Sequence, residues 1–282
     1  MVFETILYDV DRNVATITMN RPEVANAQST TMIDEIDAAL DAADLDEDVR
    51  VVVLSGAGKH FSSGHDLKAI VGGENADDWV KMRETPEGKF HHEQVMYYNR
   101  CVRLRNFRKP TIAAVQGSCI AAGLMLACMC DLIVAADDAR FSNPVLKMTG
   151  AGVEILVEPW ELGIRKAKEF LWLGETLDAE EALRLGMVNR VVPAADLASV
   201  VRELSSRIAL VPPITAQIVK DTINHSADLM GQGDSWKYHF MAHHFVHNTD
   251  TAVRALATRR EKGTMKDVLA EQRRVEPDSE QS

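Results

Sequence analysis

The chain has 282 residues, of which 46% are hydrophobic and 26% are charged, and it carries a formal net charge of -11. This composition is typical of a globular protein with one large core, and no apolar stretch is long enough and free enough of charge to span a bilayer. The negative charge argues against broad binding of nucleic acid, which depends on neutralising phosphates.

The first part of the chain alternates between strand and helix patterns. Two β-branched runs around the turn signal DRN, in the segment ETILYDVDRNVATITMN, predict a hairpin. From Ser29, apolar residues recur at helical spacing behind Ser and Thr caps, which predicts a helix. The segment RVVVLSGAG then predicts a buried strand, since parallel strands covered on both faces are almost wholly apolar.

The middle of the chain continues this alternation. Residues 71–88 are polar and rich in glycine, which indicates a mobile surface loop, and HHEQVMYYNRCVRLRNF has a helical pattern. TIAAVQG and DLIVAAD predict two more buried strands, separated by SCIAAGLMLACMC, whose small and apolar residues suit a tightly packed internal helix. This order of elements predicts a largely parallel sheet with right-handed crossovers.

The last part of the chain is mostly helical in pattern. In LDAEEALRLG, Asp178 and Glu181 form a capping-box pattern and Gly186 stands where a helix would end, and MVNRVVP then predicts a strand. Helical patterns follow over residues 194–210, 213–225, 236–247 and 250–262, and the final residues look frayed. We therefore predict an α/β core over residues 1–193 and a helical region over 194–282, within one structural unit.

Two glycine-containing strand exits, FSSGHDLK and VQGSCIAAGLM, carry the candidate chemistry. Each places small residues where a strand gives way to a helix, so backbone N–H groups can point into a cavity without obstruction from side chains. Free donors at a helix start bind anions, and two that converge form an oxyanion hole.

The order and spacing of these exits, together with NRPEVANAQSTTM before them and LDAEEALRLGMVNRVVP after them, resemble the crotonase or enoyl-CoA hydratase/isomerase family. Five segments match in order, over nearly the whole chain. The resemblance implies an α/β fold that is a spiral of ββα units, with a helical C-terminal region used in trimerisation. It also implies an acyl-CoA thioester ligand and a homotrimer or a hexamer made of two trimers.

Matched residue by residue, the resemblance assigns the two hole-forming amides to His65 and Ala122. FSSGHDLK would be a turn that presents the amide of His65, and Asp66 would open the next helix at its positive end. The imidazole of His65 either packs or points to solvent, or it makes a polar contact with the ligand, and the sequence leaves both interpretations open.

The pattern of the family's hydratases is broken at both of its usual glutamates. Met125 and Val145 stand at the matching positions, and neither can carry a proton. Some relatives carry an acidic residue a few positions further on, which makes Glu154 the candidate general base. Its apolar neighbours predict a pKa raised by desolvation, although Glu154 can also be a structural carboxylate. Glu158 and Glu161 are weaker candidates, because they fit the first turn of a helix.

The resemblance also assigns basic residues to the polyanionic coenzyme A. These residues are Arg21, Lys68 and Arg259. No metal or redox cofactor is implied, and coenzyme A enters only as part of the substrate. The four cysteines have neither zinc-site spacing nor the density of a disulfide scaffold, so we expect buried thiols. The first residues show no secretory signal, and we expect a cytoplasmic protein.

The leading interpretation is an acyl-CoA enzyme, similar to enoyl-CoA hydratases and isomerases, that stabilises a thioester enolate. Two alternatives remain open at this point. One is another reaction of the same family, namely isomerisation, C–C cleavage or thioester hydrolysis. The other is an acyl-CoA-binding protein without catalytic activity.

Overall fold

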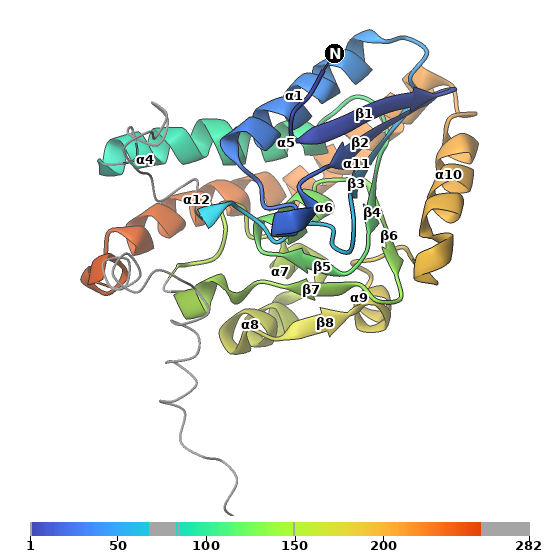
Figure 1. Ribbon diagram of the computed structural model, residues 1–282. Coiled ribbons are helices and arrows are strands. Elements are labelled where there is room, and N and C mark those ends of the chain that lie inside the picture. The colour runs from blue at the N-terminus through green and yellow to red at the C-terminus, as the bar shows by residue number, and fades with distance from the viewer. Residues whose placement is uncertain (1, 68–82, 84, 149, 255–282) are drawn as a thin grey trace, which may run out of the picture.

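The main sheet has six strands, and all its neighbouring pairs except the first are parallel. The computed structural model describes residues 2–67, 83, 85–148 and 150–254 (Figure 1). In spatial order the strands are β1 (Ile6–Asp11), β2 (Val14–Met19), β3 (Val51–Gly56), β4 (Thr111–Val115), β6 (Leu132–Ala136) and β9 (Arg190–Val192). β1 and β2 pair antiparallel, and the other neighbours pair parallel. The predicted hairpin and largely parallel sheet are therefore confirmed.

A smaller sheet lies beside the main one. It consists of β5 (Ser118–Ile120), β7 (Arg140–Ser142) and β8 (Thr176–Asp178). β5 and β7 are parallel, and β7 and β8 are antiparallel. An isolated bridge between Ser62 and Cys119 places the exit of β3 next to β5. The two glycine-containing segments singled out in the sequence are thus neighbours in space.

Helices surround the two sheets. They are α1 (Thr30–Leu45), α4 (Pro86–Glu93), α5 (Asn99–Arg105), α6 (Ala122–Cys128), α7 (Glu158–Glu161), α8 (Ile164–Leu173), α9 (Ala179–Leu185), α10 (Leu197–Ile208), α11 (Pro213–Leu229) and α12 (Gln232–His247). Short helical turns are η1 (Pro22–Val24), η2 (Gln94–Tyr98), η3 (Pro144–Met148) and η4 (Ala194–Asp196), of which η2 is a π-helix that joins α4 to α5. No helix among the described residues is long and apolar enough to cross a membrane.

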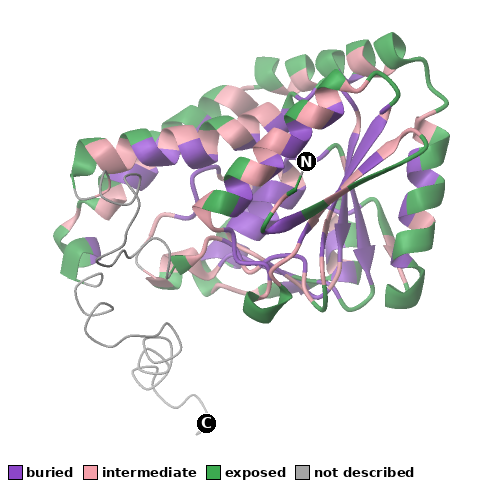
Figure 2. Ribbon diagram, turned by 45° about the horizontal axis from the view of Figure 1, so that its top comes forward, coloured by how far each residue is buried: buried purple, intermediate pink, exposed green. Residues whose placement is uncertain are grey.

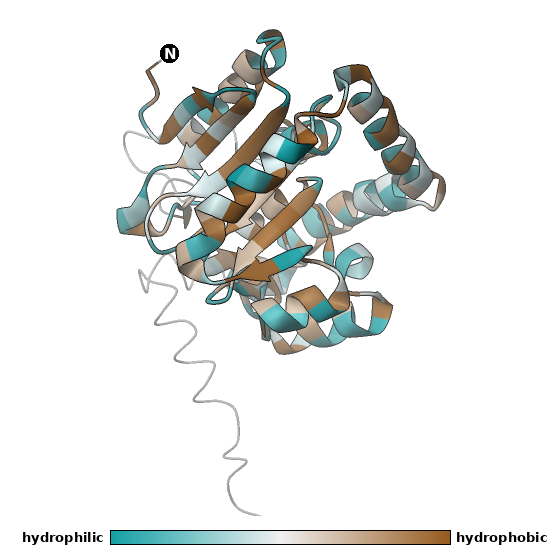
Figure 3. Cartoon of the chain, turned by 90° about the vertical axis from the view of Figure 1, so that its right-hand side faces the viewer, coloured by the Kyte–Doolittle hydropathy of each residue, from teal (hydrophilic) through white to brown (hydrophobic). Residues whose placement is uncertain are grey.

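The sheet is covered on both faces, which explains its almost wholly apolar strands. Along β3, Val52 and Leu54 point into the larger core, whereas Val51 and Val53 pack with apolar residues of α10 on the opposite face. In Figure 2 the central strands are buried and the outward faces of the helices are exposed. Figure 3, seen from the side on which α10 lies in Figure 1, shows the hydrophobic strands behind helices of mixed polarity.

Several helix ends follow the predicted capping chemistry. The Ser29 hydroxyl accepts a hydrogen bond from the Met32 amide at 3.2 Å, and Asp178 Oδ1 accepts one from the Glu181 amide at 2.8 Å. α9 ends at Gly186, whose φ of 89° is in the left-handed region that glycine adopts without strain.

Three expectations need correction or lie outside the described residues. The segment SCIAAGLMLACMC is not one helix: its first residues form β5, and α6 begins only at Ala122, because Ser118–Ile120 pairs with β7. Most of the loop predicted over 71–88 lies outside the described residues, as does the helix predicted over 250–262 beyond residue 254. The boundary at residue 193 stays a prediction.

Candidate active site

A buried asparagine holds the loop that carries His65 in place. Asn26 is fully buried, and its Nδ2 donates to the carbonyl oxygens of Ala57 and His60 at 2.9 and 2.8 Å. Its Oδ1 accepts a hydrogen bond from the Arg21 amide at 2.9 Å. A single side chain from the NRPEVANAQSTTM segment therefore sets the path of the chain between β3 and His65.

The backbone amide of His65 is left free by the way the loop is paired. Gln28 forms an isolated parallel bridge with His65: its amide donates to the Gly64 carbonyl at 2.8 Å, and its carbonyl accepts from the Asp66 amide at 3.0 Å. This pattern uses the groups on either side of His65. The His65 amide itself donates no hydrogen bond to any described residue.

The amide of Ala122 is free as well. The amide of Ala121 donates to the Ser142 carbonyl at 2.8 Å, and the Ala121 carbonyl accepts the first backbone bond of α6, from Met125 at 2.9 Å. Ala122 is the first residue of this helix, and within the described part of the chain its N–H has no acceptor. Ala121 has a positive φ of 51°, which is uncommon for a residue other than glycine, at the turn that leads into α6.

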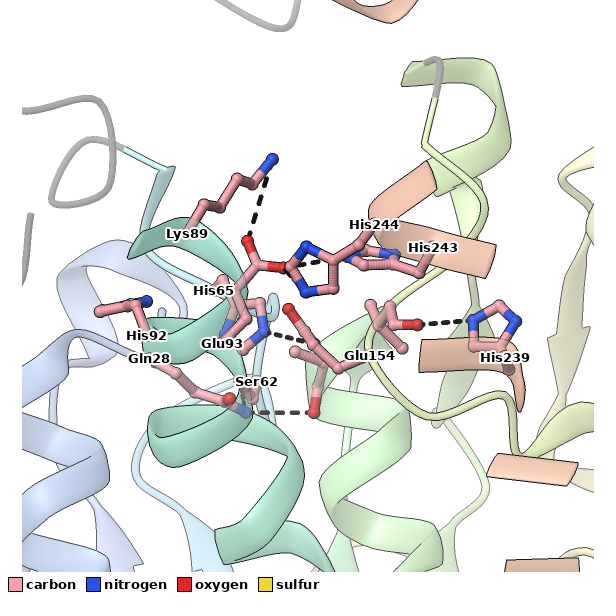
Figure 4. Close-up of polar contacts among 12 residues, drawn as sticks. Gln28, Ser62, His65, Lys89, His92, Glu93, Glu154, His239, His243 and His244 are labelled. Carbon is pink, nitrogen blue, oxygen red and sulfur yellow. Dashed lines mark hydrogen bonds and ion pairs between the residues drawn. The ribbon is translucent and has the colours of Figure 1, made fainter. Parts of the chain in front are cut away.

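The two free amides belong to segments in direct contact. A Cβ built on Gly64 would lie only 3.2 Å from the Ala122 nitrogen and 2.9 Å from the Ile120 carbonyl oxygen, so only glycine allows this approach. The Gln28 side chain also links the segments, because its Nε2 donates to Ser62 Oγ and to the Ala122 carbonyl, both at 3.3 Å (Figure 4). The two segments that carry the predicted donors are therefore in contact, and neither amide donates a hydrogen bond within the described part of the chain.

A pocket of about 350 Å³ opens at these segments. Its wall comes from the β3 exit, from the turn before α6, from η3 and the bends that follow it, and from α4, η2 and α12. The lining residues include Ser63, His65, Arg83, Lys89, Glu93, Tyr97, Ile120, Ala121, Val145, Glu154, His243 and His247.

Glu154 and His65 form a buried pair in this pocket. Glu154 is 4% exposed, its Oε2 lies 3.0 Å from His65 Nε2, and the imidazole stacks on Tyr97 with ring centroids 4.0 Å apart (Figure 4). Burial raises the pKa of Glu154, but the electrostatic attraction and the hydrogen bond of His65 outweigh burial and lower the pKa to about 2. The expected upward shift was therefore wrong, because the sequence does not show that a histidine 89 residues away is the partner.

The segment that carries Glu154 is held in place by α12. His239 Nε2 lies 2.9 Å from the Val153 carbonyl oxygen, which can only accept, so this nitrogen carries the proton. Burial lowers the pKa of His239, which keeps the imidazole neutral at neutral pH. The C-terminal region thus fixes the backbone next to the candidate base.

Sequence reasoning missed a second buried carboxylate in the same pocket. Glu93 is 2% exposed, and it contacts Arg83 Nη2 at 2.9 Å and the Nε2 atoms of His243 and His244 at 3.2 Å each. Burial raises the pKa of Glu93, but the hydrogen bond from His243 and the charge of Arg83 hold it well below its ordinary value. Histidines at 239, 243 and 247 are four residues apart, and this spacing could have indicated one helix face directed at a common target.

The same cluster has the composition of a metal site, but its surroundings argue against one. The ligand atoms of Glu93, His243 and His247 all lie within 4.8 Å of one another. However, Lys89 Nζ donates a hydrogen bond to His247 Nδ1, and Arg83 is bonded to Glu93. Two protein cations already occupy the space next to these ligands, and we assign no metal here.

The two positions that lack the family's glutamates are apolar parts of the pocket region. Met125 is 1% exposed and lines a small cavity beside His65, and Val145 lies in the wall of the main pocket. Glu158 is buried and hydrogen-bonded to Asn143 Nδ2 at 2.6 Å. Neither Glu158 nor its neighbour Glu161 lines the main pocket, so the structure brings neither of them together with His65.

The three predicted coenzyme A contacts are only partly visible. Arg21 is described: its Nη1 lies 2.8 Å from Asp66 Oδ2 and donates to the Ala27 carbonyl at 2.7 Å. Asp66 therefore pairs with Arg21 beside the free His65 amide. Lys68 and Arg259 lie outside the described residues, so their predicted roles stay predictions.

The chain is similar to known proteins over most of its length. Residues 9–266 match the family model described as enoyl-CoA hydratase/isomerase. A Mycobacterium tuberculosis protein with the provisional name enoyl-CoA hydratase EchA13 is 40% identical over 264 residues, which is 87% of this chain and 81% of the relative.

Solved structures give the same result. A probable enoyl-CoA hydratase from Mycobacterium smegmatis is 44% identical with a TM-score of 0.82, over 90% of this chain and 98% of that one. An enoyl-CoA hydratase/isomerase from Xanthobacter autotrophicus Py2 is 31% identical with a TM-score of 0.84, over 95% of this chain and 97% of that one.

Proposed function

Because this chain belongs to the enoyl-CoA hydratase/isomerase family, we propose that it hydrates or isomerises the double bond of an enoyl-CoA thioester. The observation that carries this proposal is the pair of unused amides of His65 and Ala122, because His65 and Ala121, the residue before Ala122, line a pocket that also contains Glu154. An acyl-CoA thioester has a carbonyl oxygen for the two amides and an adjacent carbon for the carboxylate. The proposed ligand therefore has a group for each of the two amides and for Glu154.

The two amides would act on charge that develops during the reaction. Adding water across an α,β-double bond, or removing a proton near the thioester, moves negative charge onto the carbonyl oxygen. Donors fixed at that oxygen stabilise the transition state more than the substrate, and losing one such donor costs about 3 to 4 kcal/mol in comparable sites. Both donors here are backbone atoms, held by Asn26 and Gln28 before the substrate arrives.

Glu154 would move the proton. Its Oε2 is held by His65, and its Oε1 makes no hydrogen bond with any described residue, so Oε1 is the atom open to the substrate. With a lowered pKa the carboxylate is ionised at neutral pH and can accept a proton. Isomerisation needs only one such group, which takes a proton from one carbon and returns it to another.

Hydration makes a larger demand, because water must be activated and a proton must also be delivered to carbon. In the family's usual hydratases two glutamates share this work, whereas Met125 and Val145 stand here. For this chain, Glu154 with its partner His65 would have to serve both steps. Isomerisation and hydration are therefore assayed together.

The test is an activity panel with matched variants. Purified protein is assayed for hydration of crotonyl-CoA and for isomerisation of a 3-enoyl-CoA, with saturated and branched acyl-CoAs to detect C–C or thioester cleavage. Glu154→Gln is expected to lower kcat by about 10² to 10⁴-fold with ligand affinity retained. Glu161→Gln is the matched control, because Glu161 does not line the pocket.

Three outcomes decide between the alternatives. Turnover that Glu154→Gln abolishes supports the proposal. Tight acyl-CoA binding without turnover of any substrate in the panel indicates a non-catalytic binding protein. Full activity in Glu154→Gln refutes the assignment of Glu154, and the proton must then be handled elsewhere.

Three further expectations belong to this proposal. Arg21, Lys68 and Arg259 would bind coenzyme A, and the reaction would need no separate cofactor.

Apolar side chains on α11 support a homotrimer or a hexamer. Ile214, Ile218 and Ile223 are each more than half exposed there. Light scattering of the purified protein measures the assembly. A cytoplasmic location stays a prediction from the sequence.

A further inference from the structure

The pocket has a polar end that the proposed reaction does not use. In Figure 4, Lys89 and Glu93 lie on the opposite side of Glu154 from Gln28 and Ser62, which adjoin the two free amides. The side chains of Lys89 and Arg83 are only 21% and 12% exposed, and both residues line the pocket with Glu93. An alkyl group would gain nothing from buried charges at this end.

The negative charge of Glu93 is already matched without Lys89. Glu93 Oε1 accepts from Arg83 Nη2 at 2.9 Å, and its Oε2 accepts from His243 Nε2 at 3.2 Å. Lys89 Nζ lies 4.0 Å from Oε1, which is beyond hydrogen-bond distance. Glu93 therefore forms a hydrogen-bonded ion pair with Arg83, and a longer ion pair without a hydrogen bond with Lys89.

The hydrogen bond that Lys89 does make adds no compensating charge. Its Nζ donates to His247 Nδ1, and an ammonium can only donate, so His247 carries its proton on Nε2. Burial lowers the pKa of His247 to about 3, which keeps this imidazole neutral. Glu154, the other carboxylate in the pocket wall, is hydrogen-bonded to His65.

Lys89 is therefore a largely buried ammonium whose hydrogen bonds, among the described residues, reach no carboxylate. Burial lowers the pKa of Lys89, against the opposing effect of the carboxylates of Glu93 and Glu154. A ligand carboxylate at this place would give the ammonium an anionic partner within hydrogen-bond distance, which the 4.0 Å ion pair with Glu93 does not. It would also contact the Nε2–H of His247, which faces the same pocket.

We propose that the acyl group of the natural substrate ends in a carboxylate, which binds Lys89 at the end of the pocket away from the thioester. This inference rests on the proposed function, since it describes the far end of the same bound acyl-CoA. It narrows the substrate class from enoyl-CoA thioesters in general to monothioesters of unsaturated dicarboxylic acids. The phosphates of coenzyme A are the other source of anionic charge, and the experiment separates the two.

The test compares ligands that differ only at the end of the acyl chain. Glutaryl-CoA and valeryl-CoA have acyl chains of equal length, one ending in a carboxylate and the other in a methyl group, and neither contains a double bond to react. Calorimetry on the wild-type protein should show glutaryl-CoA binding about 10 to 100-fold tighter, which is the usual strength of a charge-assisted hydrogen bond. Lys89→Met keeps an unbranched side chain that is one atom shorter and removes the charge, and it should abolish the preference.

Lys237→Met is the matched control variant. Lys237 lies on α12, its side chain is 71% exposed, and its recorded ion pair is with the equally exposed Asp234. Its replacement should leave the preference for glutaryl-CoA unchanged. Thermal melts of both variants verify folding, and the wild-type comparison remains decisive even if Lys89→Met fails to fold.

Each contrary result has a separate meaning. Equal or tighter binding of valeryl-CoA by the wild-type protein overturns the inference while leaving the proposed function intact. An equal loss of affinity for both ligands in Lys89→Met also overturns it, because Lys89 would then serve the coenzyme A part. Failure to bind or turn over any acyl-CoA would refute the proposed function itself, and this inference with it.

Discussion

Replacing Gly64 by alanine tests whether the reaction depends on the contact between the two amide-bearing segments. Gly64 immediately precedes His65, and its φ is 91°. An added methyl group would lie 2.9 Å from the Ile120 carbonyl oxygen and 3.2 Å from the Ala122 nitrogen. Both contacts are shorter than ordinary van der Waals separation, so the methyl group must push the segments apart.

The size of the effect follows from these distances. Moving a carbon from 2.9 Å to an ordinary contact of 3.4 Å requires a displacement of about 0.5 Å, across a pair of donors that must converge on one oxygen. Misplacement on the scale of 1 Å lowers rates by about 10²-fold in other enzymes, so we expect kcat to fall by about 10 to 100-fold. The left-handed backbone also costs alanine about 1 to 2 kcal/mol of stability.

Gly186→Ala separates the two effects. Gly186 ends α9 with a φ of 89°, and no atom lies within 4 Å of its added Cβ. Urea unfolding should show a loss of stability in both variants, with a larger loss in Gly64→Ala because of its added clash, whereas steady-state kinetics on the best substrate of the panel should show the loss of kcat only in Gly64→Ala. Equal activity in the two variants would refute the idea that the closeness of these amides drives the reaction.

Three further predictions concern buried polar groups. The pKa of Glu154 is about 2 in the folded protein against an ordinary value of 4.5, so the ionised carboxylate stabilises the fold above pH 4.5, and this stabilisation is lost as pH falls toward 2. Urea unfolding across this range should show a weaker pH dependence of the free energy of unfolding in Glu154→Gln. The pKa of Glu161 is raised to about 7, mainly by burial and also by the charge of Glu158. The folded protein therefore binds a proton at Glu161 more tightly than the unfolded chain does, and stability falls as pH rises from 4.5 to 7. Glu161→Gln should raise the free energy of unfolding at pH 8 more than at pH 5. Asn26→Ala leaves the Ala57 and His60 carbonyls without their donor and should lower the free energy of unfolding by about 2 to 4 kcal/mol in the same assay. A decrease of less than about 0.5 kcal/mol would contradict the role given to this residue.

Much of the fold could be predicted because its signals are local. The hairpin, the buried strands and the capped helices at Ser29 and Asp178 each follow from a short stretch of sequence, and all are confirmed. The family and its crotonase-like α/β fold are confirmed by the comparisons. The division of SCIAAGLMLACMC into strand and helix was missed, because it depends on pairing with a strand 20 residues further along the chain.

The site was predictable only where it is built from backbone. Glycines and small residues mark the places where main-chain groups can be exposed, and the two segments so marked are in contact in the structure, whereas the roles of His65 and Ala122 stay predictions from the family resemblance. The electrostatics depend on side chains that meet only in the folded chain. Glu154 finds His65, and Glu93 finds His243 over 150 residues, so neither the lowered pKa values nor the polar end of the pocket could be read from neighbours in the sequence.

Donors that are backbone N–H groups, like those of His65 and Ala122, place few demands on the identity of the surrounding side chains. Met125 and Val145 stand where the family resemblance predicts acids, and neither residue supplies one of the two backbone donors proposed to bind a thioester. Under the proposed function, substrate binding and proton transfer would then depend on different groups. Exchanging the side chains that line the pocket would change which bond is made or broken, while the backbone amides would still bind the thioester. Such a fold offers a starting point for redesigning reactions, since the donors proposed to bind the thioester belong to the backbone and are retained when side chains are exchanged.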